Sequence, residues 1–279
     1  MPYWFWRYIP CSGVKLEFEQ FSVYPETGEP ILNLRRRNPK QKIAIKKKHI
    51  QEDEFNVFRH VNDIDFEMEL RSESGDGTFF LDPAHVFTFL LMIKTGGWVN
   101  APAILTSSTL DDPDSEAPYI FCEPFHETVP THFGEASLTI EDVSWIKERM
   151  NVGLRFTNKP AFQNAMQALT SFHCVPFSNT ALLIAWSGLE ALFKTDTEIS
   201  FRLSLYISNY LRKGLERAYL FERLRKSYDV RSKIAHGSST KVADASEHAN
   251  FTRDILRECL EKCINTYEFP NPGSLIFGE

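Results

Sequence analysis

The residues with the clearest chemical potential stand in the last third of the chain. Arg231 precedes His236 by five residues within the segment Tyr228–Gly237. A guanidinium can hold and neutralise a phosphate, and histidine side chains take up or release a proton near neutral pH, so this pair could cleave a phosphodiester. On a regular helix the two side chains point about 140° apart, and they converge only if the helix end unwinds or a second subunit completes the site. The spacing also allows Arg231 to be paired structurally and His236 to end a helix.

One carboxylate is conspicuous in the preceding helical pattern. Ala181–Phe193 is apolar nearly all round, which predicts a helix in the middle of a bundle, and Glu190 is its only charged residue. An isolated buried carboxylate is costly unless a cation pairs with it. Arg231 continues the apolar stripe of a second predicted helix, residues 215–236. We therefore expect Glu190 to hold Arg231, with part of the guanidinium left free for a ligand.

Two cationic tracts could bind a phosphate backbone. Residues 211–233 contain eight basic and three acidic residues, and there we expect RNA contacts from Arg225, Lys226 and Lys233. Residues 35–48 contain eight basic residues and no acidic one, and they form either a second phosphate-binding tract or a solvated loop beside a short strand. The RNA-binding candidates in this second tract are Arg35, Arg36, Arg37, Lys46, Lys47 and Lys48.

Residues 1–139 are predicted to form a mixed, β-rich domain. Apolar and charged residues alternate in Ile64–Arg71 and, more weakly, in Val14–Phe18, as half-buried strands require. A glycine-containing turn then predicts a hairpin whose return strand is Thr78–Leu81. One helix is expected to begin near Asp82 and to end at a glycine pair. A sensor that delivers RNA to the rest of the chain is one role that this domain could have.

Residues 140–279 are predicted to form a helical bundle, so the chain as a whole belongs to the α+β class. Thr139 caps the first helix, and short linkers with proline or glycine favour antiparallel neighbours. The charge balance supports a domain boundary at 139/140, because residues 1–140 carry 13 basic and 21 acidic residues, whereas residues 141–279 carry 18 and 16. The predicted helices are 140–154, 160–174, 179–194, 198–212, 215–236 and 245–266.

Composition excludes several classes of protein. With 43% hydrophobic and 24% charged residues the chain is neither disordered nor collagen-like, and its longest apolar runs are too short to span a bilayer. The start is too short and too soon interrupted for a signal peptide, so we expect a soluble cytoplasmic protein. The five cysteines contain no CxxC pair, which predicts core packing for Cys259 and Cys263. Neither a metal nor a cofactor is expected.

The stretch from about 178 to 266 resembles the HEPN superfamily, and its Apea-like subgroup in particular. One part of the resemblance is Ala185–Phe193, which contains Glu190. The other part, after one intervening helix, is Tyr228–Gly237 with its R-x4-H-G motif. Ser232 stands at the polar position after the arginine, where the family more often has Asn, Asp or His.

The resemblance implies an all-α bundle that pairs with a second copy, so that the Arg and His motifs of two subunits face each other across a cleft. It further implies a metal-independent endoribonuclease of a phage-defence or toxin-like stress system, with Arg231 and His236 as catalytic residues and Glu190 and Ser232 in support. The 2′-OH of the RNA would attack the adjacent phosphate, and a regulatory protein could be a further partner. A non-catalytic HEPN module that binds nucleotide or RNA, or docks a partner, is the open alternative.

Overall fold

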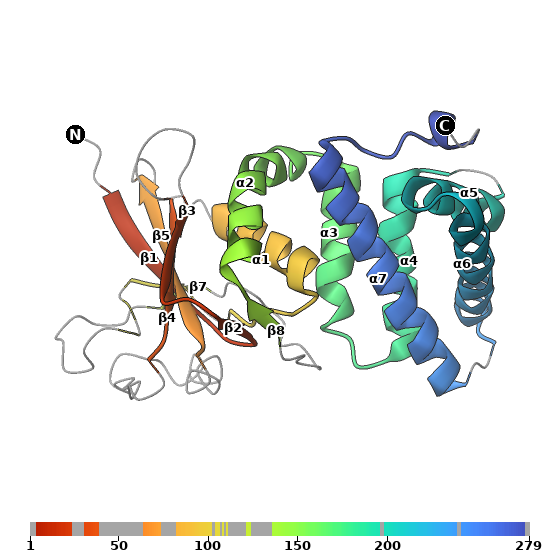
Figure 1. Ribbon diagram of the computed structural model, residues 1–279. Helices are drawn as coiled ribbons and strands as arrows, with labels where there is room; N and C mark the ends of the chain where they lie inside the picture. Colours follow the sequence, from red (N-terminus) through yellow and green to blue (C-terminus); the bar gives the residue numbers. More distant parts are fainter. Residues whose placement is uncertain are drawn as a thin grey trace. The chain divides into compact units, whose positions relative to one another are not determined.

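The chain folds into an antiparallel sheet in its N-terminal region followed by helices, so it is α+β with a helical C-terminal domain, as predicted (Figure 1). It divides into two compact units, Met1–Asn151 and Val152–Glu279. The computed structural model describes residues 4–23, 31–38, 64–73, 82–101, 104–106, 108, 110, 121–123, 136–195, 198–238 and 241–276.

Six of the described strands form the main sheet of the first unit, in the order β3-β4-β5-β1-β6-β7. All neighbouring pairs in this sheet are antiparallel. Its strands are β1 (Trp4–Cys11), β3 (Gln20–Val23), β4 (Leu32–Arg36), β5 (Phe66–Glu73), β6 (Ile104–Leu105) and β7 (Phe121–Glu123). The strand predicted in Val14–Phe18 is confirmed as β2 (Val14–Leu16), which pairs in parallel with β8 (Ala136–Leu138).

Strand β5 confirms the alternation predicted for Ile64–Arg71, with two differences. Its apolar side chains are fully buried on one face, as expected, but Glu67 on the opposite face is also fully buried, where the pattern predicted exposure. The two strands hydrogen-bonded to β5 are β1 and β4, which come from distant parts of the sequence. The predicted hairpin partner, Thr78–Leu81, and the turn before it lie outside the described residues.

Helix α2 (Ile140–Phe156) contains the boundary between the two units, which the sequence placed before it. The helix starts as predicted, because the N–H of Asp142 donates to Thr139 Oγ1 and the N–H of Thr139 donates to Asp142 Oδ2, both at 3.1 Å. Its first turns belong to the first unit, where Lys94 lies 5.3 Å from the ring of Trp145. Its last residue, Phe156, packs 5.3 Å from the ring of Phe162 in the second unit.

The helical unit confirms the predicted helices with ends shifted by at most three residues. Helix α4 is central, since it packs against α3, α5, α6 and α7, and α7 crosses α3 and α4 (Figure 1). Gly188 permits this packing, because a Cβ there would lie 2.8 Å from side-chain carbons of both Ala168 and Leu256. The helices are α1 (Asp82–Thr95) of the first unit and α3 (Pro160–Phe172), α4 (Ser178–Phe193), α5 (Ile199–Leu211), α6 (Gly214–Ala235), α7 (Val242–Thr266) and the unpredicted α8 (Pro272–Leu275) of the second.

In the part of the chain that the structure describes, no helix combines the length and the apolar composition that crossing a membrane requires.

Candidate functional site

Helices α4 and α6 bring the two predicted partners, Glu190 and Arg231, into direct contact. Arg231 Nη2 lies 3.0 Å from Glu190 Oε1 and donates a hydrogen bond to Oε2 at 3.3 Å. The hydroxyl of Tyr228, one helical turn before the arginine, donates to Glu190 Oε1 at 3.3 Å. The pairing predicted from the lone charges on two apolar helix faces is therefore confirmed. The carboxylate has a cationic and a neutral donor, both from α6.

The pair lies at the edge of the core rather than inside it. The side chains of Glu190 and Arg231 are 29% and 25% exposed, so the carboxylate expected to be buried is only partly covered. Both side chains of the ion pair are therefore partly open to solvent. Arg231 Nε is buried, and no described residue accepts a hydrogen bond from it. Burial raises the pKa of Tyr228, which keeps its hydroxyl a donor to the carboxylate.

Buried side chains from α4, α6 and α7 form a chain of polar contacts next to the Glu190–Arg231 pair. The ring of Trp186 meets the ring of Tyr228 edge-on, with centroids 5.0 Å apart. Trp186 Nε1 donates to Ser227 Oγ at 3.3 Å, and Ser227 Oγ lies 2.9 Å from Thr252 Oγ1. Both hydroxyls are fully buried. Sequence reasoning missed Ser227 and Thr252, although a polar residue directly before Tyr228 on the apolar stripe was a usable signal.

Helix α6 ends in a regular cap directly at His236. The N–H of Ser238 donates to the carbonyl of Lys233 at 2.9 Å, and the N–H of Gly237 donates to the carbonyl of Ile234 at 3.0 Å. Gly237 adopts φ +77°, which a glycine tolerates best. This is the Schellman arrangement, which closes the helix without unwinding it. The end of α6 is therefore not unwound, and Arg231 and His236 do not converge within one chain.

His236 and Arg231 consequently lie on different sides of one helix. His236 is exposed, and among the described residues no hydrogen bond or ion pair joins it to Arg231. Ser232 is half-buried, and its carbonyl accepts the N–H of His236 at 3.1 Å. One chain thus supplies a guanidinium and an imidazole from the same five-residue stretch, but it does not bring them together.

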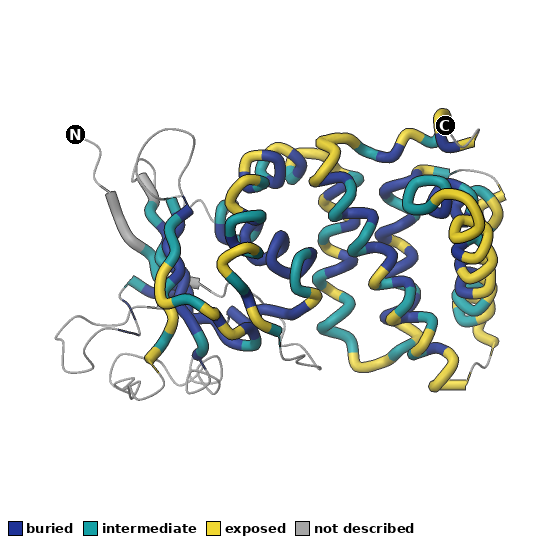
Figure 2. Tube along the Cα trace, in the orientation of Figure 1, coloured by how far each residue is buried: buried dark blue, intermediate teal, exposed yellow. Residues whose placement is uncertain are grey.

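The outer side of α6 carries the predicted cationic surface. Arg225, Lys226 and Lys233 are all exposed, and α6 is open to solvent along most of its length (Figure 2). Arg212, just before the helix, is held instead by both carboxylate oxygens of Glu258. The hydrogen bonds that Arg212 donates to Glu258 raise the pKa of the guanidinium. Three of the predicted RNA-binding residues therefore stand where a polyanion can reach them.

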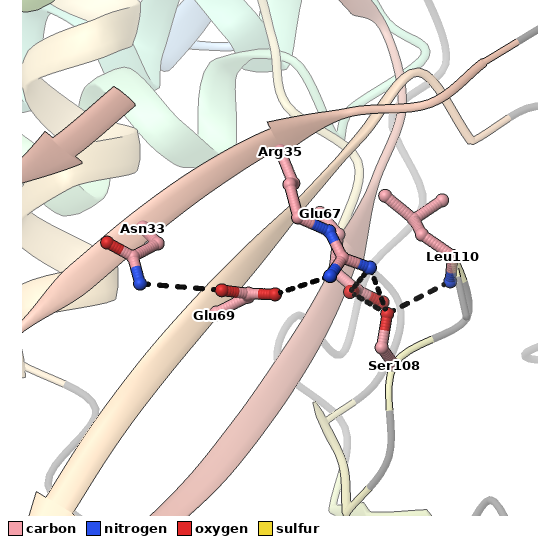
Figure 3. Close-up of polar contacts among 6 residues, drawn as sticks. All are labelled: Asn33, Arg35, Glu67, Glu69, Ser108 and Leu110. Carbon is pink, nitrogen blue, oxygen red and sulfur yellow. Dashed lines mark hydrogen bonds and ion pairs between the residues drawn. The ribbon is translucent and has the colours of Figure 1, made fainter. Parts of the chain in front are cut away.

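Arg35, from the second cationic tract, is part of a network in the first unit (Figure 3). Its Nη1 lies 3.1 Å from Glu69 Oε1, and its Nη2 donates to Ser108 Oγ at 2.8 Å. Ser108 Oγ in turn donates to Glu67 Oε1 at 2.5 Å and accepts the N–H of Leu110 at 3.0 Å. The serine hydroxyl thereby uses its one donor and both acceptor positions. Glu67, which is fully buried, is stabilised by this arrangement.

The rest of the tract is divided between protein contacts and undescribed residues. Arg36 Nη1 donates to the carbonyl of Leu16 and Arg37 Nη1 to the carbonyl of Ile64, each at 3.4 Å. Lys46, Lys47 and Lys48 lie outside the described residues. The arginines of this tract are thus engaged by the sheet domain, a role that the sequence pattern did not reveal.

Two cysteines of α7 belong to the core of the helical unit. Cys259 and Cys263 are fully buried, as predicted for core packing, and burial raises the pKa of both thiols. No cluster of three or more metal-binding side chains occurs within the described segments.

Comparisons with protein-family models, curated proteins and solved structures gave no match to this chain.

Proposed function

We propose that the protein is a metal-independent endoribonuclease of HEPN type, whose reaction uses Arg231 and His236. The observation that carries the proposal is the state of Arg231: Glu190 and Tyr228 fix its guanidinium, while a quarter of the side chain stays open to solvent. An exposed histidine ends the same helix, on a cationic surface. Phosphodiester cleavage requires a held cation and a proton-transfer group at the same phosphate, and α6 carries one of each.

The proposed chemistry uses the nucleophile that RNA itself carries. One histidine takes the proton of the 2′-OH, whose oxygen attacks the adjacent phosphorus. Arg231 neutralises the charge that builds up on the phosphate oxygens. The bond from phosphorus to the 5′-oxygen then breaks, and a second histidine protonates that oxygen. The products are a 2′,3′-cyclic phosphate and a 5′-hydroxyl.

This mechanism needs two chains. A single chain has one His236, held away from its own Arg231 by the closed end of α6. In a homodimer with two-fold symmetry, the same stretch of α6 from each subunit can face the other, which supplies the second proton-transfer group. We therefore propose that the active form is a homodimer through the helical unit, in the cytoplasm, as part of a phage-defence or toxin-like stress system with a regulatory partner.

A second candidate function is a non-catalytic module that binds RNA or nucleotide, or docks a partner. The contacts of Arg231 favour it, because Glu190, Tyr228 and the buried chain behind them form a complete structural cluster without His236. In that case the cluster would only hold α4 against α6.

A digestion experiment separates the two candidates. The purified full-length chain is incubated with single-stranded RNA, with and without EDTA, and the product ends are determined. The nuclease proposal expects cleavage that survives EDTA and leaves 2′,3′-cyclic phosphate ends. Intact RNA, or cleavage that chelation abolishes, would contradict it.

A further inference from the structure

A groove of about 500 Å³ runs between α6 and α7, away from the Glu190–Arg231 pair. From α6 it is lined by Leu215, Tyr219 and Arg223, and from α7 by Phe251 and Ile255. Its volume lies in the range of sites for small organic molecules. The groove is therefore large enough for a group such as a nucleobase.

Aromatic rings and an arginine alternate in this groove. The Arg223 guanidinium carbon lies 4.1 Å from the ring centroid of Phe251 and 5.9 Å from that of Tyr219. Tyr219 is 68% exposed, so its ring is open to a further stacking partner. A flat aromatic surface beside an arginine is the arrangement on which unpaired bases stack.

The surroundings of the groove are cationic. Residues 212–226 contain six basic and two acidic residues, and one of the acidic ones, Glu216, lines the groove. Lys213, Arg217, Arg225 and Lys226 are exposed, and none of them has an ion pair within the described part of the chain. A polyanion laid along α6 would find several charge partners without displacing existing ones.

We propose that this groove binds single-stranded RNA, with a base stacked on Tyr219 and the backbone phosphates held by Arg223 and the neighbouring cations. The proposal rests on the proposed function and extends it to a second part of the substrate. Tyr219 precedes Arg231 by twelve residues, so the stacked base lies about 18 Å along α6 from Arg231. Base faces are available only in unpaired strands, so a duplex does not fit.

The test measures binding of a 2′-O-methyl oligonucleotide, which lacks the nucleophile and stays intact, to the full-length protein. Tyr219→Ala should raise the Kd about tenfold, whereas Tyr219→Phe, which keeps the ring, should stay within about twofold of wild type. Tyr267→Ala, at another exposed tyrosine, is the matched control and should bind normally.

The arginine has its own readout. Arg223→Gln should reduce the slope of log Kd against log salt by about 0.7, the value for one phosphate contact on a single strand. The matched control is Arg155→Gln, since Arg155 is also exposed and lies over an aromatic ring, that of Phe156, without lining the groove. Thermal unfolding of each variant verifies that it is folded.

Three results would overturn the proposal: an unchanged Kd in Tyr219→Ala, equal affinity for duplex and single strand, or a loss of oligomerisation in Tyr219→Ala with RNA affinity intact. The last result would identify the groove as a protein interface. The two proposals fail separately. Tyr219-dependent binding without any RNA cleavage refutes the nuclease alone, and cleavage with a KM unchanged in Tyr219→Ala refutes the groove alone.

Discussion

The contact between Glu190 and Arg231 predicts an asymmetric pattern of stabilities in a double-mutant cycle. Replacing Glu190 with Met removes the carboxylate that pairs with Arg231, whose Nε already lacks a hydrogen-bond partner among the described residues. The same replacement removes the acceptor of the Tyr228 hydroxyl. Replacing Arg231 with Met is milder, because the tyrosine still donates to the carboxylate. In the double variant two apolar side chains of similar length face each other, and only the tyrosine hydroxyl lacks its partner.

The magnitudes follow from the partial burial of the pair. Exposed ion pairs contribute about 0.2–1 kcal/mol, and breaking a buried pair costs about 3–5 kcal/mol. With both side chains about three-quarters covered, we expect losses in the free energy of unfolding of about 2 kcal/mol for Glu190→Met and about 1 kcal/mol for Arg231→Met. The double variant should lose about 1 kcal/mol, the cost of one unpaired hydroxyl, which gives a coupling of about 2 kcal/mol.

Urea unfolding of the four proteins measures this coupling. The matched control is the pair formed by Arg202 on α5 and Glu198 just before it, where Arg202 Nε lies 3.5 Å from Glu198 Oε2 and the side chains are 42% and 71% exposed. Its coupling should not exceed about 0.5 kcal/mol. If the Glu190–Arg231 coupling is as small as that of the control, the pair does not hold α4 to α6 and the reasoning is refuted.

Three further predictions concern packing, buried charge and pH. Gly188→Ala puts a methyl group 2.8 Å from carbons of α3 and α7 and should destabilise the helical unit by about 1–3 kcal/mol in urea unfolding. Arg35→Met removes the guanidinium that lies 3.9 Å from the buried Glu67 and should cost the first unit about 3 kcal/mol. Burial raises the pKa of Cys263 from 9.0 to about 11, so the unfolded chain ionises first. The free energy of unfolding should therefore fall as the pH rises from about 9 to about 11, and less steeply in Cys263→Ala.

The predictions for Gly188 and Arg35 each have a control variant. Ser187→Ala, at an exposed position beside Gly188, should change stability by less than about 0.5 kcal/mol. Glu19→Gln removes a carboxylate that is 91% exposed and should be similarly neutral, in contrast to Arg35→Met. A normally stable Arg35→Met would show that the contacts of Arg35 do not stabilise the first unit. Identical pH curves for Cys263→Ala and wild type would show that this thiol is not the group responsible.

The helical unit was largely predictable because its signals are local. Periodic apolar residues and capping residues such as Thr139 set the helix ends, and the single charges on two apolar faces identified Glu190 and Arg231 as partners. The exposed fraction of the Glu190–Arg231 pair was less predictable, because it depends on how far the neighbouring helices cover α4.

The network around Arg35 shows what sequence patterns cannot supply. Its members come from β4, β5 and the segment after β6, and long-range strand pairing brings them together. In the sequence, Glu67 occupies the exposed phase of an alternating strand and Arg35 starts a basic run. Both patterns predict solvent exposure, so a buried ion pair becomes visible only when the register of the sheet is known.

The rate of RNA cleavage by His236→Ala distinguishes a catalytic role of the α6 end from a purely structural one. His236 is exposed at the end of α6, so its replacement should leave the fold intact, as circular dichroism can verify. Ser238→Ala, two residues further on and also exposed, is the matched control. The account predicts that His236→Ala cleaves at least about a hundredfold more slowly than wild type while Ser238→Ala does not, because general acid–base groups contribute that much or more. Equal rates for His236→Ala and wild type would contradict it.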